Sequence, residues 1–353
     1  MKQGIGILLQ SKWNQGSNML LQKVKLWSCQ EWLLAMTLSL LDEMNSRVVL
    51  FDGAMGTEIQ KLSPQPDDFP EKKEGFNDGL TLTRPEWIKT IHRKYLAAGA
   101  DCIETNTFGS NLFKLQEYGY GERTIELNRR AAQLAREVCS EFSDKPRYVI
   151  GTMGPSGYLP SSNDPDLGSK TPDELSKGYN PQATGLIEGG VDALLIETSQ
   201  DILEVKIAIE ASKEAMENLS RSVPLIANVT LDQYGKMLLG TPVQAAYTTV
   251  SGMGIDVFGL NCSTGPAEMM PSVRWLNEQE DLPILVVPNA GMPHNDGGRA
   301  VYKMTPAEMS KILEDFLIKF NRVRIIGGCC GTNAEHIYEL RNMLEKDHKG
   351  NPH

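Results

Sequence analysis

The sequence has few cysteines, no excess of positive charge and no long apolar run, and each shortage excludes a class of protein. Six cysteines in 353 residues are too few for a scaffold built on disulfides. A net charge of -10, with no basic cluster to offset it, argues against a nucleic-acid partner because phosphates would be repelled. The apolar run 32–41 is too short to cross a bilayer, so we expect no membrane anchor.

An export signal is also missing from the N-terminal part. The run 32–41 follows a mixed polar stretch, and Asp42 and Glu43 come after it in place of a small-residue cleavage site. We therefore expect a cytoplasmic protein, whose thiols stay reduced and free to bind metal. The remaining composition, 41% hydrophobic and 23% charged, is that of an ordinary globular protein.

From Arg47 onward, short apolar runs alternate with helix-compatible stretches. The eight runs are rich in β-branched or bulky apolar residues and lie at 48–51, 102–105, 148–151, 193–197, 225–229, 257–261, 284–287 and 324–327. Eight strand–helix units predict a (β/α)8 TIM barrel. A doubly wound open sheet is the alternative, but it should carry a G-x-G-x-x-G turn after its first strand, and residues 51–57 do not.

The helix boundaries show two recurring signals. The predicted helices lie at 85–98, 125–142, 175–189, 203–216, 244–253, 267–277 and 307–320. A T-x-x-E pattern, in which threonine caps the first turn and glutamate reaches back, begins at Thr83, Thr171, Thr305 and Thr332. Helix ends carry a glycine followed by an aspartate, at 99–101, 190–192 and 254–256, which places the aspartate at the entrance of the next strand.

Three segments are expected along the chain. Residues 1–45 are predicted as an N-terminal extension, in which 31–45 form an amphipathic helix able to cover the bottom of the following domain. Residues 46–345 are predicted as the barrel, and 346–353 as a C-terminal tail.

Two adjacent cysteines, Cys329 and Cys330, stand between glycines after the last predicted strand. Successive side chains of a strand point to opposite faces, so both sulfurs can face one site only if the backbone leaves that geometry. The flanking Gly328 and Gly331 permit this. Taken alone, the pair fits a metal site, two buried small residues in a tight turn, or a redox-active vicinal disulfide.

In a barrel, the active site lies at the carboxyl ends of the strands. Polar or metal-capable residues stand where the predicted strands stop, among them Asp52, Glu104, Thr105, Asn106, Glu197, Asn228, Asn261, Cys262, Asn289, Cys329 and Cys330. Cys262 follows the sixth strand as Cys329 follows the eighth, close enough for three sulfurs to share one metal. Three thiolates with an open fourth position are typical of a catalytic zinc site. Cys102 and Cys139 are predicted as core residues.

Six motifs, taken in chain order, resemble the homocysteine S-methyltransferase family. They are FDGAMGT at 51–57, ETNTF at 104–108, GP at 154–155, FGLNC at 258–262, PNAGMP at 288–293 and GGCCGT at 327–332. The likeness is strongest to the homocysteine-binding module of the cobalamin-dependent methionine synthase branch, and it covers about residues 45–345. It implies a zinc-containing (β/α)8 barrel that transfers a methyl group to homocysteine and forms methionine.

The resemblance also implies roles for individual residues. Cys262, Cys329 and Cys330 would hold Zn2+ and carry the catalysis, with the homocysteine sulfur in the fourth position. The same resemblance implies that Asp52 and Glu197 bind the substrate amino group, that backbone amides near Gly53, Ala54, Thr105 and Asn106 bind its carboxylate, and that Asn289 supplies an oxygen when substrate is absent.

The methyl donor stays open at this point. The chain stops soon after the eighth predicted strand, so we expect neither a folate-binding barrel nor a cobalamin module within it. The motif at 289–293 resembles the cobalamin-dependent branch, which favours methylcobalamin carried by a separate corrinoid-binding protein. Direct transfer from S-methylmethionine or betaine is one alternative. Another thiol acceptor is a second, although Asp52 and Glu197 would repel an acidic coenzyme.

Overall fold

Eight parallel strands form a single sheet in this protein. The computed structural model describes residues 39–297 and 299–347; most of the predicted N-terminal extension and most of the C-terminal tail lie outside the described residues. The strand order is β1-β10-β7-β6-β5-β4-β3-β2. The strands are β1 Val49–Leu50, β2 Cys102–Glu104, β3 Tyr148–Met153, β4 Ala193–Ser199, β5 Leu225–Val229, β6 Val257–Asn261, β7 Ile284–Val287 and β10 Val323–Ile326.

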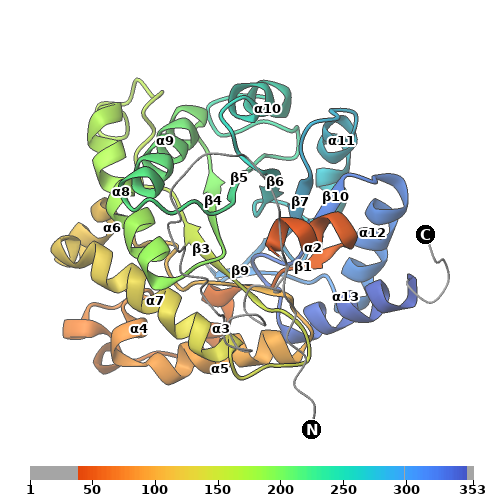
Figure 1. The fold of residues 1–353 in the computed structure, drawn as a ribbon, viewed down its shortest axis with the longest axis horizontal. Coiled ribbons are helices and arrows are strands. Elements are labelled where there is room, and N and C mark those ends of the chain that lie inside the picture. The colour runs from red at the N-terminus through yellow and green to blue at the C-terminus, as the bar shows by residue number, and fades with distance from the viewer. Residues whose placement is uncertain (1–38, 298, 348–353) are drawn as a thin grey trace, which may run out of the picture. The chain divides into compact units, whose positions relative to one another are not determined.

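The sheet curls into a ring with helices on its outside (Figure 1). At the seam between β1 and β2, the Asp101 amide donates to the Leu50 carbonyl at 2.7 Å and the Glu104 amide donates to the Asp52 carboxylate at 3.1 Å. The predicted (β/α)8 barrel is therefore confirmed. The predicted strands 225–229, 257–261 and 284–287 match β5, β6 and β7 residue for residue.

All seven predicted helices are present, with small shifts at their ends. The helices are α2 Leu40–Ser46, α3 Met55–Lys61, α4 Leu80–Thr83, α5 Pro85–Ala97, α6 Leu112–Glu117, α7 Thr124–Cys139, α8 Pro172–Gly189, α9 Ile202–Asn218, α10 Val243–Ser251, α11 Pro266–Asn277, α12 Pro306–Lys319 and α13 Ala334–Asp347, with short 3-10 turns at Pro66–Asp68, Pro70–Lys72 and Gly121–Arg123. In α7, the buried residues Leu127, Ala131, Leu134 and Val138 recur at helical spacing and face the sheet.

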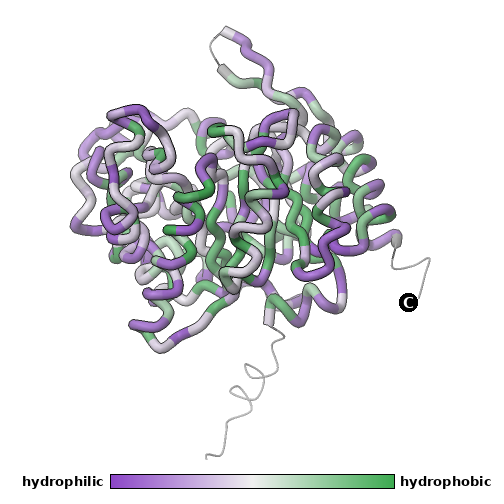
Figure 2. Tube along the Cα trace, turned by 90° about the horizontal axis from the view of Figure 1, so that it is seen from above, coloured by the Kyte–Doolittle hydropathy of each residue, from purple (hydrophilic) through white to green (hydrophobic). Residues whose placement is uncertain are grey.

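Two hydrophobic cores result from the alternation of strand side chains. One lies inside the barrel and includes Leu195 of β4 and Ile325 of β10, while their neighbours Ile196 and Ile326 belong to the core between strands and helices. Apolar residues are accordingly concentrated in the barrel wall (Figure 2). Cys102 and Cys139 are buried in these cores, as predicted.

Helix α2 closes one end of the inner core. Leu40 and Met44 belong to the same cluster as the inward-facing strand residues, and Arg324 of β10 donates to the Met44 carbonyl at 2.6 Å. The described helix Leu40–Ser46 overlaps the end of the helix predicted at 31–45, whereas positions 31–38 lie outside the described residues.

The aspartates at the strand entrances join neighbouring strands. Asp101, Asp192 and Asp256 each donate their amide to a carbonyl of the preceding odd-numbered strand. Their carboxylates accept the amides of Leu50, Val149 and Leu225 at 2.9, 2.7 and 2.8 Å. The repeated glycine-to-aspartate signal therefore sets the register of β1 with β2, β3 with β4 and β5 with β6.

The predicted helix caps are half right. Thr171 and Thr305 form complete capping boxes with Glu174 and Glu308. The caps at Thr83 and Thr332 are wrong. The Thr83 hydroxyl donates to the Asp68 carbonyl at 2.6 Å, and the Thr332 hydroxyl donates to the Cys329 carbonyl at 2.7 Å. Tertiary contacts therefore use both hydroxyls, and the Asn333 side chain accepts the first amides of α13 instead.

A small antiparallel hairpin between β7 and α12 is absent from the predicted elements. Its strands are β8 His294–Asp296 and β9 Arg299–Val301, paired from His294 with Val301 to Asp296 with Arg299. The hairpin projects beyond the other elements at one end of the barrel (Figure 2). Its sequence has no apolar alternation, so a strand signal was lacking.

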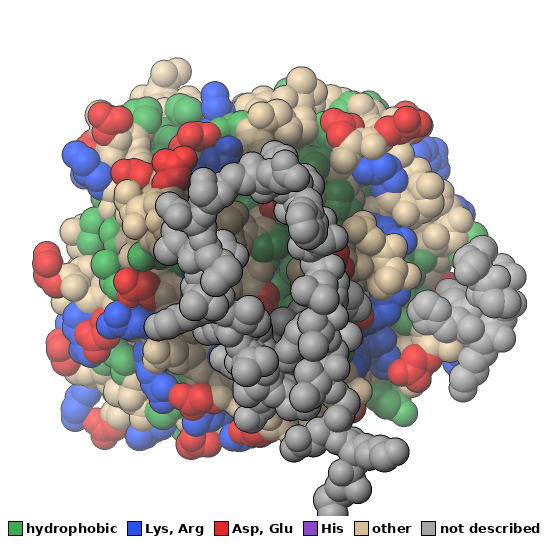
Figure 3. All heavy atoms as spheres, in the orientation of Figure 1, with side chains coloured by type: hydrophobic (Ala, Val, Ile, Leu, Met, Phe, Trp, Pro, Cys, Tyr) green, Lys and Arg blue, Asp and Glu red, His purple; other side chains and the backbone are tan. Residues whose placement is uncertain are grey.

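The described surface mixes charges of both signs. On the face shown in Figure 3, acidic and basic side chains are interspersed among polar and apolar ones. Of the helices in the described part of the chain, none is both long and apolar enough to cross a membrane.

Candidate metal and substrate site

Three cysteine sulfurs converge at the carboxyl ends of β6 and β10. The Sγ atoms of Cys262, Cys329 and Cys330 all lie within 4.8 Å of one another, and those of Cys262 and Cys330 are 3.8 Å apart. All three side chains are partly exposed and line one pocket. The three sulfurs singled out in the sequence are thus brought together by the fold.

The backbone at both sulfur-bearing turns departs from regular geometry. Gly331 has φ +81°, and a Cβ at Gly328 would lie 2.5 Å from the Thr332 hydroxyl oxygen, so the glycines around the cysteine pair are sterically required. Cys262 and Ser263 also have positive φ, of 60° and 59°. Non-glycine residues adopt this region rarely, and such strain concentrates at functional sites.

The hydrogen bonds among the three cysteines shift their pKa values in different directions. Hydrogen bonds from Cys262 and Cys329 stabilise the Cys330 thiolate and, with a contribution from the Tyr302 hydroxyl, lower the pKa of Cys330 well below its usual range. The pKa of Cys329 is raised by its hydrogen bonds to Cys262 and Cys330 and by burial. A divalent cation among these sulfurs would replace the shared protons, because thiolate is the ligand form of cysteine.

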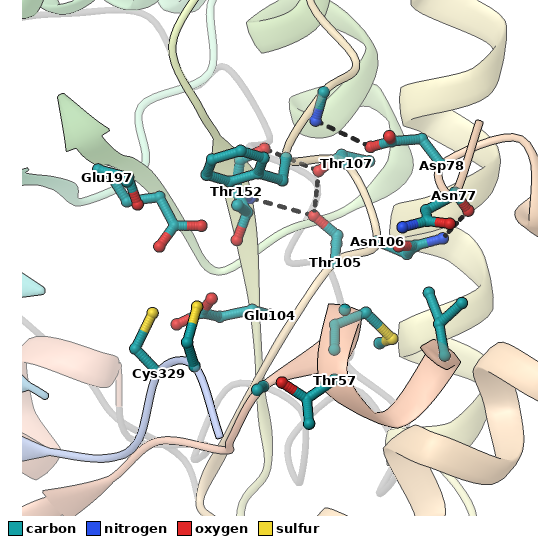
Figure 4. A pocket seen from close by; sticks show the side chains of 18 of the residues that line it. Thr57, Asn77, Asp78, Glu104, Thr105, Asn106, Thr107, Thr152, Glu197 and Cys329 are labelled. Atoms are coloured by element: carbon teal, nitrogen blue, oxygen red, sulfur yellow. Dashed lines mark hydrogen bonds between the residues drawn. The ribbon is translucent and has the colours of Figure 1, made fainter. Parts of the chain in front are cut away.

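Three carboxylates lie near the sulfurs: Asp52 after β1, Glu104 at the end of β2 and Glu197 in β4. Glu104 and Glu197 line the same pocket, whereas Asp52 is not among its lining residues and accepts the Glu104 amide. Asp52 and Glu197 are only 3% and 7% exposed. Figure 4 shows Glu104, Glu197 and Cys329 directed toward one cavity. The Asn261 amide donates to Glu197 at 2.9 Å, and no Lys, Arg or His in the described part of the chain forms an ion pair with any of the three carboxylates.

This cluster raises the pKa of each member. Burial is the main cause for all three, and the charge of Glu104 adds to it for Asp52 and Glu197. The pKa of Glu104 rises to about 7. Buried carboxylates without a cation partner are costly, so the site is suited to a cationic ligand group. Glu104 was noted in the sequence as a polar residue at a strand end, but it was given no role among the predicted substrate-binding residues.

The predicted carboxylate-binding residues fall into two groups. The Ala54 amide donates to the Thr332 hydroxyl at 3.2 Å and the Thr105 amide to the Ile150 carbonyl at 2.9 Å, so both are engaged. The amides of Gly53 and Asn106 have no hydrogen bond among the described residues. The Asn106 side chain turns away to the Asn77 carbonyl at 2.9 Å (Figure 4).

Asn289 follows β7 beside the cysteine turn. Its amide donates to the Thr264 carbonyl at 3.0 Å, and the next amide, of Ala290, donates to the Cys330 carbonyl at 2.9 Å. The side chain is 1% exposed, and its Oδ1 finds no hydrogen-bond partner in the described protein. A buried oxygen without a hydrogen-bond partner calls for an explanation, and Asn289 is one residue away from Ala290, whose amide contacts the cysteine turn.

The three sulfurs, Glu104 and Glu197 line a cavity of about 440 Å³. Pockets of roughly 300–1,000 Å³ hold drug-sized ligands, so there is room for a small substrate and part of a second reactant. The cavity is also lined by residues that no sequence signal singled out, among them Asn77, Asp78 and Tyr118. Burial raises the pKa of Asp78 to about 6, and its carboxylate accepts from Gly109 and Ser110, both at 3.0 Å.

These features define a (β/α)8 barrel with three converging cysteine sulfurs at the carboxyl ends of its strands. Residues 49–344 match the family model described as homocysteine S-methyltransferase, and the chain belongs to this family. The family resemblance drawn from the motifs is thereby confirmed.

Two mycobacterial proteins are among the relatives of this chain. The chain is 42% identical over 303 residues to methionine synthase of Mycobacterium tuberculosis (strain ATCC 25618 / H37Rv), a match that covers 85% of this chain and 25% of the relative. It is 40% identical over 313 residues to methionine synthase of Mycobacterium leprae (strain TN), covering 88% and 25%. The chain spans about a quarter of the length of these relatives.

A solved structure shows the same fold. The metallated form of the homocysteine methyltransferase MmuM from Escherichia coli matches with a TM-score of 0.65, covering 84% of this chain and 96% of that chain. The sequence identity is 23%, so this likeness concerns the fold alone.

Proposed function

We propose that this chain transfers a methyl group to the sulfur of L-homocysteine, forming methionine, with Zn2+ held by Cys262, Cys329 and Cys330. The observation that carries the proposal is the meeting of three sulfurs with the carboxylates of Glu104 and Glu197 in one cavity of a family member, with the buried Asp52 carboxylate next to Glu104. A thiol with an ammonium group matches both halves of that arrangement.

The residues present fit zinc. Three thiolates with an open position are a known catalytic zinc set, and the spacing of the sulfurs allows one ion to contact all three. The unpartnered Oδ1 of Asn289 supports its assignment as the oxygen ligand in the absence of substrate. When bound, zinc would keep the substrate sulfur deprotonated at neutral pH, which matters because a free thiol has a pKa near 8.5 and only the thiolate is nucleophilic.

The chain's own residues orient the amino acid. Asp52 and Glu197, joined by Glu104, would accept hydrogen bonds from the ammonium group, and their negative charge would offset its positive one. The amides of Gly53 and Asn106 are the proposed donors to the substrate carboxylate. The new S–CH3 bond forms as the donor's bond to that carbon breaks, in line, from the open side of the cavity.

We infer that the methyl group arrives on a corrinoid carried by a separate protein. The support is the likeness of the motif at 289–293 to the cobalamin-dependent branch and the wide cavity above the sulfurs. A sulfonium or betaine donor would instead leave methionine formation independent of any partner.

The test is methionine formation from homocysteine with methylcobalamin, S-methylmethionine, betaine and methylfolate in parallel, together with metal analysis. We expect about one zinc per chain, turnover with methylcobalamin, and loss of both zinc and turnover in Cys330→Ala. Removing a metal that contributes several kcal/mol should lower the rate by about 1,000-fold or more. Cys139→Ala, which alters a cysteine buried in the outer core, is the matched control.

Three results would contradict parts of this proposal. Full activity in a metal-free preparation would exclude zinc. Turnover with S-methylmethionine but not with methylcobalamin would exclude the corrinoid donor. Methylation of another thiol in preference to homocysteine would exclude the proposed acceptor.

A further inference from the structure

Two segments that lie far apart in the chain meet beside the site through a reciprocal pair of hydrogen bonds. The Ala54 amide, in the loop after β1, donates to the Thr332 hydroxyl at 3.2 Å. The Gly331 amide, in the cysteine turn, donates to the Thr57 hydroxyl of α3 at 3.2 Å. Each segment thus supplies one amide and one threonine hydroxyl. Because the two bonds run in opposite directions, they fix both the distance and the orientation of the loop 52–54 relative to the cysteine turn.

The Thr332 hydroxyl also bonds to a residue that carries one of the three sulfurs. It donates to the Cys329 carbonyl at 2.7 Å, so a single oxygen atom joins that residue to the Ala54 amide. Thr332 is fully buried. Hydrogen bonds in such surroundings are electrostatically stronger than in water. The Thr332 hydroxyl is therefore a firm link between the loop 52–54 and the cysteine turn.

The loop 52–54 is held from its other side by Tyr95 of α5. The Tyr95 hydroxyl donates to the Ala54 carbonyl at 3.1 Å. A Cβ at Gly53 would lie 2.8 Å from the Tyr95 ring and 2.9 Å from the Thr332 hydroxyl oxygen, so the Gly53 backbone fits closely between the two side chains. This loop contains Asp52 and the free Gly53 amide, which are the proposed contacts to the amino and carboxylate groups of the substrate.

We propose that Thr57 and Thr332 are positioning residues that couple the amino-acid half of the site to its metal half. They hold the loop 52–54 against the cysteine turn, so that a homocysteine bound by its amino and carboxylate groups has its sulfur directed to the three cysteines. This inference rests on the proposed function and adds the residues through which the two halves act together. Coupling is reciprocal, so zinc should strengthen homocysteine binding by the same factor as homocysteine strengthens zinc binding.

The test measures a coupling ratio, which is the Kd of homocysteine for the reduced, metal-free protein divided by the Kd for the zinc-loaded protein, both from calorimetric titration. Thr332→Val keeps the shape of the side chain and removes the hydroxyl. We expect the ratio to fall about 10-fold, since coupling between two sites is typically about 5–150-fold. Thr332→Ser retains a hydroxyl and should restore the ratio. Thr57→Val removes the other bond and should lower the ratio as well.

Two controls separate coupling from a general loosening of the site. Tyr95→Phe removes the hydrogen bond to the Ala54 carbonyl but leaves both threonine bonds, so it should weaken homocysteine binding equally with and without zinc and keep the ratio unchanged. Thr124→Val is the control for loss of a buried hydroxyl. Thr124 is 2% exposed, and its hydroxyl donates to the Gly121 carbonyl at 2.7 Å, outside the site. This variant should change neither Kd.

A wild-type ratio in Thr332→Val would overturn the inference and leave the proposed function intact. Equal weakening of homocysteine binding with and without zinc would also overturn it, because the hydroxyl would then support the structure alone. If Thr332→Val does not fold, Thr57→Val, at a partly exposed residue that lines the cavity, decides the question by the same ratio (Figure 4). A wild-type protein whose affinity for homocysteine does not depend on zinc would overturn the proposed zinc function and the inference with it.

Discussion

The two ends of the barrel both bury carboxylates, but they treat the charge in opposite ways. At the amino end, Asp101 is fully buried and pairs with Arg47 and Arg341, each at 2.7 Å, and with Lys145. Burial alone would raise the pKa of Asp101, but the hydrogen bond from Arg47 and the charges of Arg341 and Lys145 lower it well below its usual range.

At the carboxyl end, Asp52, Glu104 and Glu197 form a cluster without an ion-pair partner among the described residues, and the pKa of each is raised. The amino end thus uses its charge to assemble the barrel, since Arg47 precedes β1 and Arg341 belongs to α13. The carboxylates at the carboxyl end, by contrast, form no ion pair that joins elements of the barrel. A cationic group, such as the ammonium group of the proposed substrate, would offset the free-energy cost of burying these carboxylates.

The largest effect is expected for Asp101→Asn, which tests whether the charge at the amino end stabilises the barrel. This substitution leaves three cations around a neutral side chain. Breaking a buried ion pair by removing one partner costs about 3–5 kcal/mol, so we expect a loss of that size in the free energy of unfolding, measured by urea denaturation. The KM for homocysteine should stay unchanged in the folded fraction, because the substituted residue lies at the opposite end.

Asp192→Asn is the matched control for this substitution. Asp192 occupies the same position before β4 and accepts the Val149 amide at 2.7 Å, but it has one cation partner, Arg136, and both side chains are about one-third exposed. We expect a loss of only about 1 kcal/mol. Equal losses in the two variants would show that the buried charge network adds nothing to the backbone hydrogen bond.

Glu197→Gln should have the opposite effects: it should weaken homocysteine binding and leave the stability of the protein unchanged. The amide keeps the volume and can still accept from Asn261, but it loses the charge that the substrate ammonium would meet. A hydrogen bond to a charged group contributes about 1.5–3 kcal/mol, which corresponds to a 10–100-fold rise in the KM or Kd for homocysteine. Calorimetric titration measures the Kd, and a stability scan should show no loss.

Glu204→Gln distinguishes a substrate contact from a general effect of buried carboxylates. Glu204 is also buried near this end, but it accepts hydrogen bonds from Ser156 and Tyr179. That variant should lower stability and leave homocysteine affinity unchanged. If Glu197→Gln destabilised the protein without weakening homocysteine binding, the carboxyl end would be structural like the amino end.

The barrel and its three sulfurs could be predicted because their signals are local and repeated. Apolar runs of similar length alternate with helical stretches, and each glycine-to-aspartate step marks a strand entrance, as Asp101 and Asp192 show. Cys262 and Cys329 could be placed at one rim because each directly follows a run. The order of the strands then follows from the fold class, without any knowledge of side-chain contacts.

What could not be predicted depends on contacts between distant segments. Thr332 carries a capping pattern, but its hydroxyl is used by the cysteine turn and the Ala54 amide. The positive φ of Cys262 has no local signature, since neither it nor Ser263 is a glycine. Tyr302 meets Gly331 only after the hairpin folds back. The role of Glu104 depends on the absence of a cation nearby, which no single sequence segment shows.

The smallest expected effect concerns how stability depends on pH. The pKa of Glu104 is raised from its ordinary value of 4.5 to about 7, so between these values the folded protein binds a proton that the unfolded chain releases. Its contribution to stability is fully present below about pH 4.5 and is lost as pH rises to about 7. Asp101 acts in the opposite sense: its pKa is lowered, so its contribution is present above its ordinary value and is lost on acidification.

Glu104→Gln should therefore stabilise the metal-free, ligand-free protein at pH 8 by about 1 kcal/mol, a modest figure because Glu104 borders an open cavity, and should change little at pH 4.5. Urea denaturation at several pH values measures the difference. Saturating homocysteine should shrink it at pH 8, since the ammonium group then compensates the carboxylates of the wild type. A variant that is less stable than wild type at pH 8 would mean that Glu104 already has a compensating partner, and the contrast between the two ends of the barrel would fail at this residue.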